Sequence, residues 1–354
     1  MGLLRFVLAL SVITAHLPGL FFIRGTVGDV SVQAFYMISG FYIAMILNGK
    51  YANKAEFWRN RLLRLFPAYL AVLLFSILVK IWISSGLSEW LSPAFEMSAR
   101  SWLFLVVSNL TLVGQDWIFF TAAGSSFLPL IVVPQAWSLS VEITFYAVAP
   151  FLLRPFRPKL IAGIVLGTVV ARLSFAHFGM MNDPWSYRFF PLEIGTFLAG
   201  SLAWAFYESM KTHLARVPEV AGCALTVITL GFAISYYALP IDEMAKRLFF
   251  LLILFFSLPL MFSLTKDVKL DKAIGDLSYP VYLCHFVVIE LLAYWWGTTA
   301  MTQWQMAGAI LASVGLAWII FFLIERPGER FRQSLNRTAL PMRHGNTPEA
   351  TCRT

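Results

Sequence analysis

The apolar stretch that decides the fold is the first one in the chain, residues 3–23, which read LLRFVLALSVITAHLPGLFFI. A run of about 20 mostly apolar residues can cross a bilayer as a helix. It contains two ionisable side chains, Arg5 near its start and His16 about half-way along. They are eleven residues apart, which is close to three helical turns, so we expect both side chains on one helix face, roughly 16 Å apart along the axis. Ionisable groups within a span usually face a bundle interior or a watery cavity, so this pair indicates a functional site.

The overall composition is also typical of a membrane protein. Of 354 residues, 59% are hydrophobic and only 13% are charged, whereas a soluble domain carries about 25% charged residues. We attribute the net charge of +8 to Lys and Arg in cytoplasmic loops, and we expect no nucleic-acid partner. The cysteines, Cys223, Cys284 and Cys352, have no metal-ligand spacing, so we expect no bound metal.

Ten stretches are long and apolar enough to be membrane spans. They cover roughly residues 3–23, 30–48, 64–84, 134–153, 159–178, 188–207, 219–239, 247–265, 274–296 and 305–325. A shorter apolar segment near 101–114 is expected to be a re-entrant or interfacial helix within the loop 85–133.

The loops between these spans differ in positive charge. Twenty Lys and Arg residues fall on one side and five on the other, so the positive-inside rule places both termini in the cytoplasm. We therefore predict an all-α polytopic membrane protein with about ten transmembrane helices. Residues 1–327 are expected to form one membrane domain, and residues 328–354 a polar, unstructured cytoplasmic tail.

The first pair of candidate residues has both a functional and a structural interpretation. Neutral imidazole accepts a proton from an alcohol near neutral pH, so His16 has the chemistry of a general base. The alternative is a packing histidine that hydrogen-bonds to a neighbouring helix. Arg5 is also expected from topology alone, because basic residues collect at the cytoplasmic ends of spans.

A basic cluster follows the second predicted span. Residues 57–67 read FWRNRLLRLFP and contain Arg59, Arg61 and Arg64. Arg61 and Arg64 lie one turn apart on one helix face, and guanidinium groups suit bidentate binding of phosphate. The alternative is positive-inside anchoring with contact to lipid headgroups.

The fourth predicted span begins with residues 137–146, WSLSVEITFY. Helical spacing places Ser138, Glu142 and Tyr146 on one face, which should point into the bundle. Glu142 has the chemistry to orient a substrate hydroxyl or to pair with a buried base. The alternative is a structural ion pair with Arg172 or Arg188.

The ninth predicted span begins with residues 278–285, SYPVYLCH. Ser278, Tyr282 and His285 share one helix face, and this polar face is a candidate lining for the same cavity. The alternative is ordinary hydrogen bonding between helices.

Four further residues are interpreted as packing positions and one as a helix end. Ser39 and Gly40 in residues 35–41, FYMISGF, have no base beside them in the sequence, so we interpret them as a close helix contact. Gly195 and Gly200 are expected to allow close helix packing. Glu325 is interpreted as part of a helix terminus with local charge pairing.

The order of these motifs along the chain resembles the acyltransferase 3 family of integral membrane acyltransferases. The resemblance rests on Arg5-x10-His16 and on residues 35–41, 57–67, 137–146 and 278–285, and it covers about residues 3–327. It implies about ten spans and transfer of an acyl group, usually acetyl, from acyl-CoA to a hydroxyl. The acceptors it implies are sugars of lipopolysaccharide, exopolysaccharide or lipo-oligosaccharide, and sometimes small molecules such as macrolides.

The family motifs transfer to this chain with two departures. Gln33 stands where the family often has an acidic residue, so we assign it no charged role. Ile143 follows Glu142 where the family often has a second glutamate, so Glu142 has to act alone.

The predicted function is acetyl-CoA-dependent O-acyl transfer to a glycan or glycolipid by a multi-pass protein of the bacterial inner membrane. Acyl-CoA is expected as a co-substrate, with no tightly bound cofactor. The catalytic residues we expect are His16, Arg5 and Glu142; the acyl-CoA phosphates are assigned to Arg59, Arg61 and Arg64; and substrate binding is assigned to Trp137, Ser138, Tyr146, Tyr282 and His285.

Three alternatives to this function are kept. The first is a proton-coupled transporter, which the buried charges allow, although the inverted repeats common in transporters are absent from the sequence. The second is acylation of a small molecule that is not a carbohydrate. The third is an inactive relative that only binds a glycan, against which the intact Arg5 and His16 pair argues.

Overall fold

The computed structural model describes residues 1–17, 26–49, 53–121, 128–214 and 219–338. Regular structure in these ranges is helical, without a strand, which confirms the all-α prediction. The longer helices are α1 (Gly2–Ala15), α2 (Gly28–Gly49), α3 (Lys54–Ile83), α5 (Ala99–Thr111), α7 (Trp137–Leu152), α8 (Pro158–His177), α9 (Phe190–Leu214), α10 (Glu219–Ser235), α11 (Glu243–Thr265), α13 (Ser278–Trp296), α14 (Gln303–Ile320) and α15 (Arg326–Thr338). The shorter ones are α4 (Leu87–Trp90), α6 (Gln115–Thr121) and α12 (Lys269–Asp276), four 3₁₀ turns (Ser92–Glu96, Leu128–Leu130, Pro134–Ala136 and Tyr236–Ala238) and a π-helix (Phe321–Glu325).

Within the described residues, seven helices are long and apolar enough to cross a membrane, so the chain is a multi-pass membrane protein. Each of the seven coincides with a predicted span. They cover Gly28–Gly49, Lys54–Ile83, Pro158–His177, Val220–Ala238, Glu243–Thr265, Lys269–Trp296 and Gln303–Leu335.

The other three predicted spans are also helical. They correspond to α1, α7 and α9, of which α1 has 14 residues and α7 has 16. Residues 18–23 of the first predicted span lie outside the described residues. The helix expected near 101–114 is α5. The number of ten spans and the cytoplasmic termini stay predictions.

Several helix boundaries follow from local capping chemistry. The Asn53 side chain accepts a hydrogen bond from the backbone of the first turn of α3, and Asp242 does the same for α11. Thr302 and Gln305 form a reciprocal capping box at the start of α14. Helix α13 ends at Gly297, whose φ of 63° is accessible to glycine without a steric penalty.

Helices α2 and α9 make a close backbone contact. A Cβ atom added at Gly40 would lie 1.8 Å from the carbonyl oxygen of Phe197, and one added at Gly200 would lie 1.8 Å from that of Met37. Small residues allow such backbone contact, which stabilises helix pairs in lipid, where the hydrophobic effect contributes little. The close packing predicted at these glycines is therefore confirmed.

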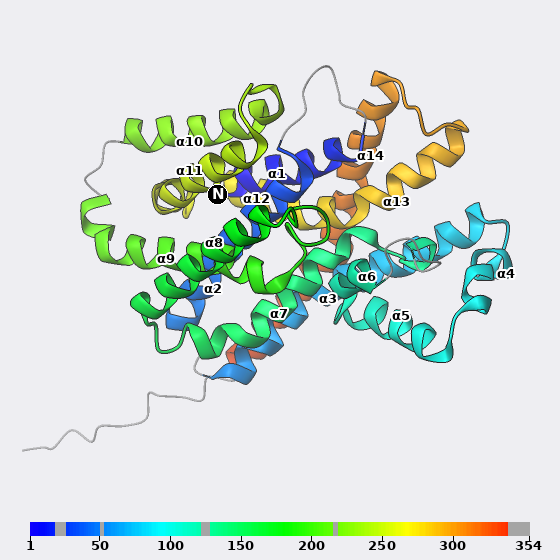
Figure 1. The fold of residues 1–354 in the computed structure, drawn as a ribbon, viewed down its shortest axis with the longest axis horizontal. Coiled ribbons are helices and arrows are strands. Elements are labelled where there is room, and N and C mark those ends of the chain that lie inside the picture. Colours follow the sequence, from blue (N-terminus) through cyan, green and yellow to red (C-terminus); the bar gives the residue numbers. More distant parts are fainter. Residues whose placement is uncertain (18–25, 50–52, 122–127, 215–218, 339–354) are drawn as a thin grey trace, which may run out of the picture.

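The helices that surround the candidate site are α1, α2, α3, α7, α12 and α13. Helix α1 packs against α2, α12 and α13, and α13 packs against α3 and α14. Helices α4 to α6 lie together at one end of the molecule and α8 to α11 at the other (Figure 1).

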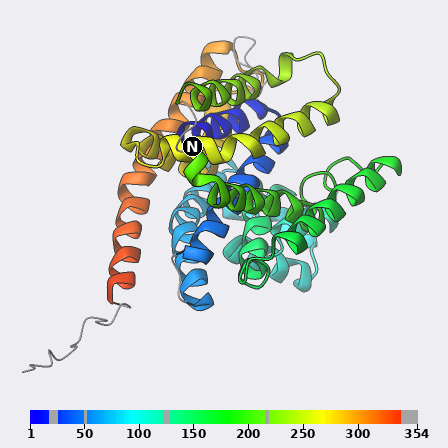
Figure 2. The ribbon, with the colours of Figure 1, turned by 90° about the vertical axis from the view of Figure 1, so that its left-hand side faces the viewer.

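The C-terminal region differs from the expected unstructured tail. Residues 328–338 belong to α15, which follows the π-helix at the end of α14 and extends away from the body of the protein (Figure 2). Helix α15 also contacts α3. The rest of the expected tail, residues 339–354, lies outside the described residues.

Candidate active site

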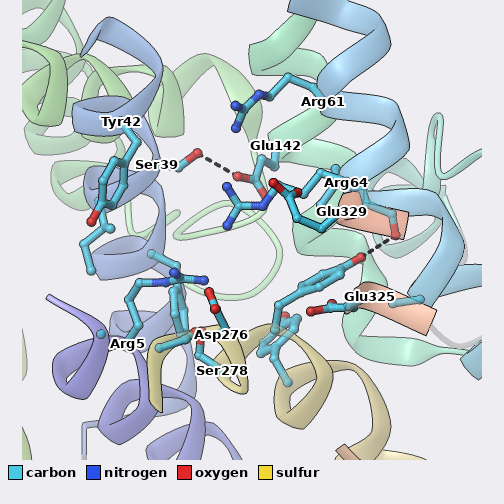
Figure 3. A pocket seen from close by; sticks show the side chains of 18 of the residues that line it. Arg5, Ser39, Tyr42, Arg61, Arg64, Glu142, Asp276, Ser278, Glu325 and Glu329 are labelled. Carbon is cyan, nitrogen blue, oxygen red and sulfur yellow. Dashed lines mark hydrogen bonds between the residues drawn. The ribbon is translucent and has the colours of Figure 1, made fainter. Parts of the chain in front are cut away.

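A cavity of about 800 Å³ lies between α1, α2, α3, α7, α12, the start of α13 and the C-terminal segment formed by the π-helix and α15 (Figure 3). This volume is in the range of small-molecule sites, about 300–1,000 Å³. Seven of the predicted site residues line it, although they come from four helices: Arg5, Arg61, Arg64, Ser138, Glu142, Tyr146 and Tyr282.

Among the described residues, six arginines line the cavity, and three of them are among the predicted site residues: Arg5, Arg61 and Arg64. The other three, Arg326, Arg330 and Arg332, belong to α15. Arg5 from α1 and Arg64 from α3 reach into it from opposite walls, and Arg61 lies one turn before Arg64 (Figure 3). Arg59 is exposed and does not line the cavity, so only Arg61 and Arg64 of the predicted cluster of three share it. At about 100° per residue, Arg59 lies about 200° around the helix from Arg61 and cannot share its face.

Acidic groups partly balance these arginines, and the sequence interpretation missed them. Asp276 lies near Arg5, and Glu325 and Glu329 line the wall beside Arg64 (Figure 3). Glu325 belongs to the π-helix, and its buried Oε1 has no hydrogen-bond partner among the described residues. The sequence signal for Glu325 was a carboxylate at the end of an apolar span. We interpreted it as part of a helix terminus and did not expect it to line the cavity.

Glu142 is the centre of a small hydrogen-bond network in the cavity. The hydroxyls of Ser39 and Tyr146 both donate to its Oε1 atom, each at 2.6 Å. Hydrogen bonds to an ionised acceptor are stronger than neutral ones. The packing interpretation of the Ser-Gly pair is therefore only half right: Gly40 makes the helix contact, and Ser39 contacts Glu142.

The proposed structural partners of Glu142 are engaged elsewhere. Arg172 pairs with the fully buried Glu193 at 2.7 Å, and Arg188 pairs with Asp183 at 2.6 Å. The ion-pair alternative for Glu142 is therefore not found with either arginine. Gln33 donates to Glu193 at 2.8 Å and so takes part in this buried network without carrying a charge.

Helix α7 is held in place at the cavity by hydrogen bonds from both sides. The hydroxyls of Tyr282 and Ser138 are 2.6 Å apart, and Tyr282 also donates to the carbonyl of Gln135 at 2.9 Å. On another face, Ser140 donates to the carboxylate of Asp116 on α6 at 2.6 Å. Burial raises the pKa of Asp116. These contacts fix the position of Ser138 relative to α13.

Trp137 has a different location from the one predicted. It is buried and lies outside the cavity lining, with the Arg188 guanidinium 4.3 Å from its ring centroid. Phe119 contacts the same guanidinium at 3.9 Å. Trp137 therefore holds Arg188 by cation–π contact and is not placed to bind a ligand in the cavity.

The two candidate histidines are stacked on each other outside the lining of the cavity. His16 caps the C-terminal end of α1, and its ring centroid is 5.4 Å from that of His285 and 4.9 Å from that of Phe286. His285 is fully buried, with Nδ1 2.7 Å from the carbonyl of Tyr282, while its Nε2 has no hydrogen-bond partner among the described residues. His16 is exposed.

Neither histidine lines the cavity, but Tyr282 connects them to it. The Tyr282 ring lines the cavity and lies 6.0 Å from the ring of His285. Arg5 and His16 therefore mark opposite ends of α1: Arg5 lines the charged cavity, and His16 lies outside its lining. Among the described residues, no group of three or more His, Cys, Asp or Glu side chains is arranged to hold a metal ion.

Comparison of the sequence with known proteins assigns the chain to a family. A family profile described as an acyltransferase domain matches residues 1–322. The chain belongs to the acyltransferase 3 family. The match includes all the predicted site residues, whereas Glu325 and α15 lie beyond it.

Curated relatives are similar over most of this chain. It is 28% identical to exopolysaccharide production protein ExoZ of Rhizobium meliloti, over 85% of this chain and 90% of that protein. It is 27% identical to nodulation protein 10 of Rhizobium leguminosarum bv. viciae, over 86% and 83% respectively. It is 25% identical to O-acetyltransferase OatA of Staphylococcus aureus, over 85% of this chain and 52% of that protein. No solved structure matches the chain.

Proposed function

We propose that this acyltransferase 3 protein transfers an acetyl group from acetyl-CoA to a sugar hydroxyl of an exported glycan, with His16 as the general base. The observation that supports this most is the connection between an arginine-lined cavity and His16 through the packed rings of Tyr282 and His285. It provides a site for phosphates at one end and a titratable base at the other. The protein acts in the bacterial inner membrane as a single domain formed by residues 1–327, and the cavity opens to the cytoplasm.

The donor enters the cavity with its phosphates against Arg5, Arg61 and Arg64. Guanidinium groups bind phosphate oxygens in bidentate fashion, and three of them match a ligand with several phosphates. The pantetheine arm then extends along α1 and α13 towards the histidine pair. The acidic residues of the same cavity balance part of this positive charge before the donor binds.

The chemical step takes place at His16. His16 removes the proton of the acceptor hydroxyl as its oxygen attacks the thioester carbonyl carbon. The new C–O bond forms, the C–S bond breaks, and the proton passes to the departing CoA thiolate. General base catalysis contributes typically about 10²–10⁴-fold to such a step.

His285 and Glu142 are positioning residues in this mechanism. The buried ring of His285 stacks on His16 and fixes its orientation. Catalysis by proximity requires such a fixed orientation of the base relative to the substrate. Glu142 is bonded to Ser39 and Tyr146, so it organises the cavity wall along which the donor lies. Ser138 and Tyr282 shape the passage between cavity and base.

The acceptor class rests on the relatives. The names of two of them refer to exopolysaccharide production and to O-acetyl transfer, and the sequence motifs resemble a family that acylates cell-surface sugars. We therefore infer a glycan or glycolipid acceptor.

The test is direct transfer of label. Purified protein in lipid nanodiscs is mixed with acetyl-CoA carrying a labelled acetyl group and with glycans from the envelope of the producing organism. We expect base-labile label in the glycan, and NMR should show the acetyl group on a sugar oxygen. Absence of label in the glycan, together with solute flux through the same protein in liposomes, would favour the transporter alternative.

A further inference from the structure

A second cavity, of about 900 Å³, lies between α3 and α13, and no predicted site residue lines it. Its charged feature is an ion pair between Lys80 and Glu290, which are 210 residues apart in sequence. Lys80 Nζ contacts both carboxylate oxygens, at 2.9 and 3.2 Å. Both residues belong to helices long and apolar enough to span the membrane. Ionisable residues in such segments are functional candidates, because they are costly to keep there.

A single side chain, that of Phe286, separates this cavity from the proposed base. Phe286 lines it and also touches the ring of His16, with the centroids 4.9 Å apart. Along α13, Tyr282 therefore lines the arginine-containing cavity, His285 stacks on His16, and Glu290 lines the second cavity. One helix thus carries two cavities in sequence, with the histidine pair between them. In a two-substrate reaction at His16, this arrangement gives each substrate a cavity of its own.

The chemistry of the second cavity suits a neutral polyhydroxylated ligand. Glu290 is only partly covered, with 35% of its side chain exposed, and a carboxylate accepts more hydrogen bonds than the two contacts that Lys80 makes. Lys80 has further N–H donors, so the pair offers donors and acceptors together, which matches a ring of hydroxyl groups. The side chains of Phe286, Ile289 and Tyr294 add an apolar wall for the C–H face of a sugar ring.

A charged ligand fits the same cavity less well. An anionic headgroup would be repelled by Glu290, and a cationic headgroup by Lys80. The volume is within the range of about 300–1,000 Å³ for small-molecule sites, which is enough for a short saccharide.

We propose that the cavity around Lys80 and Glu290 binds a neutral sugar unit of the acceptor glycan and presents one of its hydroxyls to His16. This inference rests on the proposed function, because it assigns the acceptor side of that reaction. Lys80 and Glu290 are specificity residues that contact hydroxyls of the bound sugar, and neither takes part in proton transfer.

The first experiment measures sugar binding without any acyl transfer. Saturation-transfer NMR is recorded on the full chain in nanodiscs, free of sugar-based detergent, with methyl glucoside, methyl galactoside and methyl mannoside as probes. We expect transfer to at least one glycoside in the native protein and a several-fold smaller signal in the double variant Lys80→Met/Glu290→Gln. This variant removes both charges at nearly constant volume, so it leaves no uncompensated buried charge. The matched control is the double variant Lys211→Met/Glu208→Gln, which likewise removes both charges of one ion pair, on α9 and outside the lining of both cavities.

The outcomes separate this inference from the proposed function. The inference is wrong if no glycoside binds or if the double variant binds glycosides as well as the native protein does. It is also wrong if phosphocholine displaces the bound glycoside, which would identify a lipid-headgroup site. A thermal melting temperature equal to that of the native protein shows that the double variant is folded. In the transfer assay, the double variant should raise the acceptor KM by about 10- to 100-fold, the loss expected for hydrogen bonds to charged groups, and leave the acetyl-CoA KM unchanged. If the native protein binds glycosides but transfers no acetyl group, the proposed function fails and the sugar site remains.

Discussion

Replacing Arg64 by alanine should weaken acetyl-CoA binding while leaving the protein folded. Arg64 reaches into the cavity from α3, and its side chain is exposed to the solvent in it (Figure 3). A hydrogen bond to a charged group contributes about 1.5–3 kcal/mol, and solvent screening favours the lower part of this range. Since about 1.4 kcal/mol is tenfold, we expect the dissociation constant of acetyl-CoA to rise by about 10- to 30-fold.

Arg59 provides the matched control on the same helix. It is exposed and outside the cavity lining, so Arg59→Ala should change the dissociation constant less than about twofold. The assay is isothermal titration of each purified variant with acetyl-CoA and then with S-acetylpantetheine, which carries no phosphate group. The effect of Arg64→Ala should disappear with S-acetylpantetheine. An equal loss in Arg59→Ala, or an unchanged loss with S-acetylpantetheine, would refute phosphate binding by Arg64.

Three further predictions concern the network and the packing around the site. Glu142→Gln replaces two charge-assisted hydrogen bonds by weaker neutral ones and should lower the steady-state kcat by about tenfold, with an unchanged melting temperature in a thermal unfolding scan. Gly200→Ala forces α2 and α9 apart and should lower the melting temperature in detergent, whereas Gly231→Ala, with open space around it, should not. Arg172→Met leaves a fully buried carboxylate uncompensated and should cost about 3–5 kcal/mol of stability; Lys211→Met breaks an exposed pair and should cost less than about 1 kcal/mol in the same chemical unfolding series.

Contacts along a single helix were accessible from the sequence. Arg61 and Arg64 share a face three residues apart, and Glu142 bonds to Tyr146 four residues later, as helical spacing predicts. The same geometry should have excluded Arg59, because its position on the helix points away from the other two.

Contacts between helices were not accessible. Ser39 meets Glu142 across 103 residues and Lys80 meets Glu290 across 210. Hydropathy and spacing define each helix separately, but the partner of each polar face depends on how the helices pack in three dimensions. The pairing of α2 with α9 and of α3 with α13 therefore required the structure.

The helical segment after residue 326 was missed for a related reason. Its polar composition is typical of a disordered tail, but it continues a long apolar helix and contacts α3. Tertiary contact and a preformed helical start allow such a segment to remain helical. Cavity residues such as Glu329 therefore belong to a region that its composition alone predicts to be disordered.

The most direct test of the whole account is the single-turnover rate of acetyl transfer by His16→Ala, measured with saturating acetyl-CoA and labelled glycan. We predict a loss of about 10²–10⁴-fold with an unchanged dissociation constant for acetyl-CoA. His177→Ala, at the exposed end of α8, serves as the histidine control and should keep the native rate. Transfer by His16→Ala within a few-fold of the native rate would contradict the assignment of His16 as the base.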